Sequence, residues 1–163
     1  MMTCRIESWL RQHFPPEISD DVKEHFDIIP KVAAFDGISF GPRLNFLVGE
    51  SGSGRTRLLE RLKTSAGIIE LPAPPPVSFT AMSHGQVVFT VGMLLVKSTT
   101  QKTALLVDDI LFMLDDRLAE QFLVGVVASN KQAILTVTLG EMERAERLMR
   151  KAGVSGYGIV WQK

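Results

Sequence analysis

The chain has 163 residues, enough for one domain with a single buried core. Apolar residues make up 45% of the sequence, which excludes an intrinsically disordered chain. Eighteen basic and eighteen acidic side chains cancel, so no global charge draws the chain to nucleic acid or to an anionic membrane. With one cysteine, Cys4, an internal disulfide is excluded.

Two absences in the sequence bear on where the protein works. The N-terminus lacks the apolar core of a signal peptide, and no uncharged apolar run reaches the length of a membrane span, about 18 residues. We therefore expect a cytoplasmic protein with no membrane span. The scattered histidines and the lone cysteine show no metal-ligand spacing.

The beginning of the chain reads as helical. Apolar residues at helical spacing predict a helix over residues 3–14, and a second helix is expected over 16–26. Two short strands are predicted next, at 31–35 and 38–40, on either side of the turn pair Asp36-Gly37.

The most informative motif is the octapeptide Gly49-Glu50-Ser51-Gly52-Ser53-Gly54-Arg55-Thr56. It fits the phosphate-binding pattern G-x-x-x-x-G-K-[ST], except that arginine replaces the lysine. A buried strand is predicted before it, over 44–48, and a helix after it, over 55–63. Free backbone N–H groups and the helix dipole make such a junction an anion site. We expect the eight residues, with Arg57 behind them, to bind the phosphates of a nucleotide.

The remaining elements alternate between strands and helices. Residues 67–71 form a candidate strand, and the prolines of 72–76 predict an extended loop. The segment 82–97 is open between strand and helix, because its β-branched residues favour a strand while its length and the cap position of Ser83 favour a helix. Further strands are predicted at 104–107, 132–138 and 157–161, and helices from about 116 to 128 and from 141 to 151.

This alternation predicts the fold class. Strands that follow helices imply right-handed crossovers and a mostly parallel sheet. We expect an α/β fold of the P-loop NTPase type with helices on both faces of the sheet. Residues 1–30 would form an N-terminal helical segment, and residues 31–163 the nucleotide-binding domain.

Two adjacent aspartates follow the apolar run 104–107. In P-loop NTPases, the hydroxyl of the loop Ser/Thr and an aspartate at the end of a second strand hold the magnesium ion. Thr56 and Asp108 fit these two roles, and Asp109 is the candidate that polarises the attacking water. The alternative is that both aspartates merely end a strand and begin a loop. The expected cofactors are ATP and Mg²⁺.

Four segments follow one another in a familiar order. They are residues 35–49, which lead into the P-loop; residues 82–86, Met-Ser-His-Gly-Gln; residues 105–109, Leu-Leu-Val-Asp-Asp; and residues 114–116, Leu-Asp-Asp. They resemble the entry strands, signature loop, Walker B strand and D-loop of ABC-type ATPase heads, and are closest to the soluble RecF/SMC-like branch.

The resemblance implies how the site is completed. In that family a nucleotide is held between the P-loop of one subunit and the signature loop of another. Ser83 and Gly85 would then bind phosphate across an interface, in a homodimer or with a larger protein partner. DNA is implied as a partner by the resemblance alone.

The chain departs from the family pattern at several positions. Arg55 replaces the P-loop lysine, Asp109 replaces a glutamate, and Leu139 stands where a switch histidine is expected. No glutamine lies between Arg57 and Ser83. We therefore expect ATP binding with slow hydrolysis, in which Arg55 and Asp109 act. The alternatives are a pseudo-ATPase that serves as a structural or regulatory module, and a small-molecule kinase, for which no arginine-bearing lid is visible.

Overall fold

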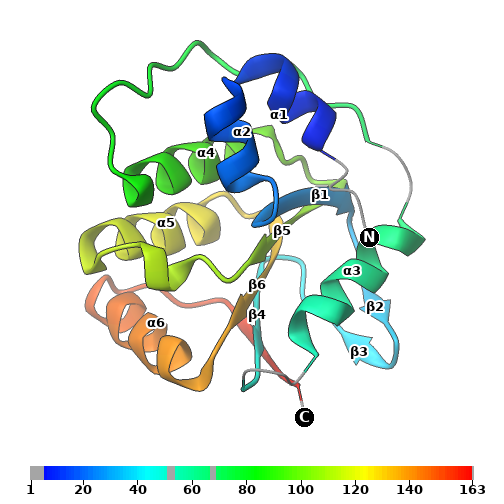
Figure 1. Ribbon diagram of the computed structural model, residues 1–163. Helices are drawn as coiled ribbons and strands as arrows, with labels where there is room; N and C mark the ends of the chain where they lie inside the picture. The colour runs from blue at the N-terminus through cyan, green and yellow to red at the C-terminus, as the bar shows by residue number, and fades with distance from the viewer. Residues whose placement is uncertain (1–5, 51–53, 67–68, 163) are drawn as a thin grey trace.

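The computed structural model describes residues 6–50, 54–66 and 69–162 (Figure 1). The helices are α1 (Glu7–His13), α2 (Pro16–Val22), α3 (Arg55–Ser65), α4 (His84–Ser98), α5 (Asp116–Ala128) and α6 (Leu139–Lys151). The strands are β1 (Phe26–Pro30), β2 (Ala34–Phe35), β3 (Ile38–Ser39), β4 (Leu44–Val48), β5 (Thr103–Asp108), β6 (Gln132–Val137) and β7 (Gly158–Trp161). A 3₁₀ turn, Leu111–Met113, follows β5.

The main sheet has five strands in the order β1-β5-β6-β4-β7. β5, β6, β4 and β7 run parallel, and β1 pairs antiparallel with β5 at one edge. The α/β class and the mostly parallel sheet are therefore confirmed. Because the four parallel strands share a direction, their carboxyl ends meet along one edge, where ligands of open α/β sheets bind.

Both faces of the sheet are covered by helices. In β4, Phe46 and Val48 pack into the larger apolar cluster, to which α1, α2, α4, α5 and α6 contribute. Leu47, between them, packs on the other face with Leu58 and Leu62 of α3. Figure 1 shows the same arrangement, with α3 and the β2–β3 hairpin on one side and the other helices opposite. This is the side-chain alternation of a strand buried on both faces.

The N-terminal segment is built into this sheet. The helix expected over 16–26 ends at Val22, and Phe26 begins β1 instead. Four consecutive residues from Phe26 to Ile29 are buried, and Phe26 pairs with Val107 of β5. Burial on both faces favours a strand over an amphipathic helix, so residues 1–30 contain a sheet strand as well as two helices.

Two other predictions change or are resolved. The open segment 82–97 is helical, because Ser83 accepts from the backbone N–H of Gln86 and Gln86 accepts in return from the Ser83 N–H. The strand expected over 67–71 is not formed by residues 69–71, and residues 67–68 lie outside the described residues. The hairpin turn is confirmed, with positive φ at Asp36 and Gly37.

Candidate functional site

The carboxyl edge of the sheet brings together two residues that are 52 positions apart. Thr56 lies in the first turn of α3, and Asp108 is the last residue of β5. The Thr56 hydroxyl donates to the Asp108 carboxylate, at 3.2 Å to Oδ2 and 3.4 Å to Oδ1. The expected pair of metal-holding groups is therefore assembled side by side.

Asp108 is held by neighbours that the sequence did not reveal. β6 lies between β4 and β5, and its Thr136 hydroxyl donates to Asp108 Oδ1 at 2.6 Å. From the antiparallel edge, the His25 ring Nδ1 donates to the Asp108 carbonyl at 2.9 Å, and the His25 carbonyl accepts from the Asp108 N–H at 2.7 Å. In the sequence, Thr136 stands out only as a hydroxyl residue within an apolar strand. That it contacts Asp108 follows from the strand order, which places β6 next to β5.

The start of α3 has the form of an anion site. Gly54, at the N-cap, has φ +94°, a conformation that favours glycine. No side chain of the described residues caps this helix end, so the N–H groups of its first turn face outward. Gly49 is tied to β6 by a bond from its N–H to the Val137 carbonyl at 3.2 Å. Ser51, Gly52 and Ser53 lie outside the described residues, so the middle of the predicted cradle is not placed.

Two buried polar atoms at this edge lack a partner among the described residues. They are Arg55 Nη1 and Glu141 Oε2. The other oxygen of Glu141 caps α6, accepting from the Thr138 N–H at 3.0 Å and from its hydroxyl at 2.9 Å. A buried atom without a hydrogen bond is costly, so each of these calls for an explanation. Glu141 was not among the residues expected from sequence.

Asp109 is near enough to both of these charged groups for them to act on its carboxyl. Its φ is +58°, which is uncommon outside glycine, and its N–H donates to the Thr136 hydroxyl at 2.9 Å. Burial raises the pKa of the Asp109 carboxyl, the Glu141 carboxylate raises it further, and the Arg55 guanidinium partly offsets both. The expected water-orienting carboxylate therefore sits at the site, but in surroundings that disfavour its charge.

Ser83 and Gly85 have other contacts. Ser83 forms the capping box of α4, and a Cβ added to Gly85 would lie 2.6 Å from the Met113 carbonyl oxygen. His84 between them pairs with Asp21 at 3.1 Å. These contacts give Ser83 and Gly85 roles within the chain. No hydrogen bond in the described part links either of them to Thr56 or Asp108.

The other residues named from the sequence lie on the surface around this edge or bind a neighbouring side chain. Glu50 and Arg57 are exposed on either side of the loop, at the end of β4 and in the first turn of α3. Leu139 is the first residue of α6 and is exposed. Asp116, in the segment that resembles a D-loop, is bound by Arg144 at 2.8 Å, which lowers the pKa of its carboxyl.

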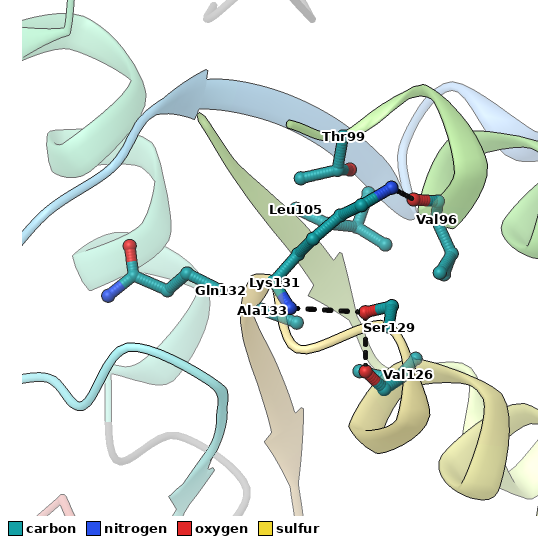
Figure 2. A pocket seen from close by; sticks show the side chains of 8 residues that line it. All are labelled: Val96, Thr99, Leu105, Val126, Ser129, Lys131, Gln132 and Ala133. Atoms are coloured by element: carbon teal, nitrogen blue, oxygen red, sulfur yellow. Dashed lines mark hydrogen bonds between the residues drawn. The ribbon is translucent and has the colours of Figure 1, made fainter. Parts of the chain in front are cut away.

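Two hollows lie away from this edge. Figure 2 shows a cavity of about 10 Å³ at the amino ends of β5 and β6, where Lys131 Nζ donates to the Val96 carbonyl at 3.1 Å. That volume holds about one water molecule. A groove of about 460 Å³ lies beside the far end of α3, between Leu62 and Phe35. Leu62 lies seven residues after Arg55 on α3, so at a rise of about 1.5 Å per residue the groove begins roughly 10 Å along the helix from Arg55.

The chain matches no protein-family model, no curated protein and no solved structure. Within the described ranges, three or more His, Cys, Asp or Glu side chains do not gather anywhere as a metal-binding group. Over the same ranges, none of the helices combines the length and apolarity needed to cross a membrane.

Proposed function

We propose that this chain is a P-loop domain that binds a nucleoside triphosphate with Mg²⁺ at the carboxyl edge of its sheet. The observation that carries the proposal is the contact between the Thr56 hydroxyl and the Asp108 carboxylate, at 3.2 Å, directly behind a glycine-rich loop. A strand, a glycine turn and a helix start that no described side chain caps would supply N–H donors for the phosphates.

The residues present fit magnesium. Mg²⁺ prefers hard oxygen ligands and is commonly bound by one or two protein oxygens together with substrate phosphates. Thr56 and Asp108 would supply those oxygens, and the ion would neutralise charge on the phosphates. Thr136 of β6 holds the Asp108 carboxylate, and His25, just before β1, holds the Asp108 backbone carbonyl.

Hydrolysis, if it proceeds, is slow in this proposal. Arg55 keeps a positive charge beside the phosphate position, but its guanidinium is planar and wider than an ammonium group. Asp109 is shorter than glutamate, and burial, together with the charges of Glu141 and Asp108, raises the pKa of its carboxyl and disfavours the ionised form. These two features favour, as a second candidate, a pseudo-ATPase that binds nucleotide without turning it over.

Nucleotide-dependent self-association is part of the proposal, and it follows the resemblance to ABC-type heads. Phe112 follows β5, Leu139 follows β6 and Trp161 ends β7, and all three are exposed, Phe112 to 64%. Large apolar side chains around one polar edge suit a protein–protein contact. A second subunit placed there would cover the phosphates, with Ser83 and Gly85 contributing across the interface.

The binding proposal is tested by calorimetry with ATP, with and without Mg²⁺, on three proteins. They are the natural chain, Gly54→Val and the control Gly153→Val. Both glycines have positive φ at a helix boundary, so valine strains each backbone similarly, by about 1–2 kcal/mol. We expect Gly54→Val alone to lose ATP. Equal ATP affinity in all three proteins would refute the assignment of this loop as the phosphate-binding site.

Self-association is tested separately by sedimentation, with and without a non-hydrolysable ATP analogue. We expect a monomer–dimer shift on adding the analogue, because the ligand bridges two surfaces. Ser83→Arg and Phe112→Ser should each abolish the shift while leaving the ATP affinity of the monomer intact. A monomer under every condition would leave nucleotide binding standing and remove the ABC-type mechanism.

A further inference from the structure

The end of β7 borders the proposed phosphate site on the side away from Asp108. Trp161 pairs with Val48, the last residue of β4, and the Gln162 N–H donates to the Val48 carbonyl at 2.7 Å. The Gln162 side-chain nitrogen lies 3.9 Å from where a Cβ on Gly54 would stand. In Figure 1 the end of β7 lies close to the start of α3.

Trp161 is unusual among the large side chains of this protein. Its relative exposure is 58%, and it ends β7, the edge strand next to β4. In the part of the chain that the structure describes, no ring contact or cation–π contact involves it. An exposed, unpaired indole beside a ligand site is a ready stacking surface.

The strand order fixes the direction in which a nucleotide would lie. If Thr56 and Asp108 hold Mg²⁺ together with the terminal phosphates, as the corresponding residues do in P-loop NTPases, those phosphates would lie on the β5 side of β4. The nucleoside would then extend toward β7, on the opposite side of β4. Neighbouring strands lie about 4.8 Å apart, so β5 and β7 are separated by about 14 Å, which an extended nucleoside triphosphate covers.

We infer that Trp161 is the base-stacking residue of this site and that the Gln162 amide lies beside the nucleoside. The inference rests on the proposed function and names the ligand class, a nucleotide rather than an inorganic polyphosphate. Stacking tolerates any base, because every base presents an aromatic face. ATP and GTP should therefore gain similarly from the indole.

The test compares Mg·ATP and Mg·tripolyphosphate on the full chain. The variants are Trp161→Ala, Trp161→Phe and the control Ile159→Ala, which lies two residues earlier on the same exposed face of β7. Trp161→Ala should weaken ATP about tenfold and leave tripolyphosphate unchanged. Trp161→Phe should keep most of the affinity, and Ile159→Ala should keep all of it.

A spectroscopic arm locates the base directly. The chain has 2 tryptophans, so Trp9→Phe leaves Trp161 as the only indole. Trp9 bonds through its ring nitrogen to the Pro72 carbonyl at 3.0 Å and is the background signal to be removed. In that variant, ATP and GTP should quench the fluorescence, whereas tripolyphosphate should occupy the site and leave it unquenched.

The outcomes separate the two proposals. If neither ATP nor tripolyphosphate binds the natural chain, the proposed function fails and takes this inference with it. If both ligands bind but Trp161→Ala has the same ATP affinity as the natural chain, the stacking role is overturned and the phosphate site stands. Equal weakening of both ligands by Trp161→Ala would likewise overturn stacking, because it would indicate a structural role.

Discussion

The two edges of the sheet treat buried polar groups in opposite ways. At the amino edge, the Gln132 amide donates to the Val32 and Gly41 carbonyls at 2.6 and 2.8 Å and accepts from the Val32 N–H at 2.8 Å. At the carboxyl edge, Arg55 Nη1 and Glu141 Oε2 are buried with no partner among the described residues. At the amino edge the buried amide is hydrogen-bonded within the chain. At the carboxyl edge two buried atoms of charged side chains have no hydrogen-bond partner among the described residues.

The contrast has one exception. Arg43 Nε, at the amino edge, is also buried without a partner in the described part of the chain, although another nitrogen of this side chain reaches the Val127 carbonyl. Asn45 beside it is fully used, with four bonds to backbone groups. The amino edge is therefore a network that fixes loops, and the carboxyl edge is where we propose that polar groups meet a ligand.

The largest effect on stability is expected when the hydrogen bonds of Gln132 at the amino edge are removed. Gln132→Ala removes three hydrogen bonds from a buried side chain and should lower the free energy of unfolding by about 3 kcal/mol. Urea unfolding measures this, with the exposed Gln101→Ala as the control. ATP affinity of the folded variant should not change. A stable Gln132→Ala protein would mean that the amino-edge network is not structural.

Removing a carboxylate charge from the carboxyl edge should lower ligand affinity more than it lowers the stability of the fold. Asp108→Asn keeps an oxygen for the Thr136 hydroxyl but loses the carboxylate charge, so Mg²⁺-dependent ATP affinity should fall about tenfold, or about 1.4 kcal/mol. Calorimetry with and without Mg²⁺ measures this. Asp109→Asn is the neighbouring control and should spare binding while lowering hydrolysis. Equal losses of affinity in both variants would contradict separate roles for the two aspartates.

A smaller effect is expected from restoring the family's lysine. Arg55→Lys replaces a wide guanidinium, which has one unpartnered buried nitrogen, with a compact ammonium group. Phosphate release should rise several-fold, with the exposed Arg117→Lys as the control. A fall in release would identify Arg55 as adapted to this site and would argue against the pseudo-ATPase candidate.

The smallest effects are expected in the pH dependence of the melting temperature, through Asp109 and Asp36, two aspartates with positive φ. Burial and the Glu141 carboxylate raise the pKa of Asp109, so its ionised form destabilises the folded state above that folded pKa. Asp109→Asn should therefore raise the melting temperature at neutral pH, and the gain should vanish below the ordinary pKa of 3.8. Asparagine tolerates the left-handed conformation, so the backbone is not strained.

Asp36 gives the matched comparison of opposite sign. The hydrogen bond and charge of Arg61 lower the pKa of the Asp36 carboxyl, so its stabilisation is present above 3.8 and is lost as pH falls through the folded pKa. Asp36→Asn should slightly lower the melting temperature at neutral pH, since the pair is exposed. The same sign for both variants would refute the assigned environments.

The sequence by itself determined the local elements and the two halves of the site. β4 has the bounds expected from its apolar run, and the helix after the glycine loop begins at Arg55 as expected. These succeed because the signals are local: an apolar run, a turn that needs glycine, and a helix start. Thr56 and Asp108 were paired by motif, and their contact agrees with that pairing.

Only the tertiary structure decided which other residues reach the site. The strand order sets β6 between β4 and β5, which makes Thr136 a partner of Asp108, and it sets β7 beside β4, which brings Trp161 to the loop. Strand order depends on long-range packing, which periodicity in one segment does not record. The same reason explains Phe26: its place beside Val107 is a pairing between distant segments, and pairing made it a strand residue.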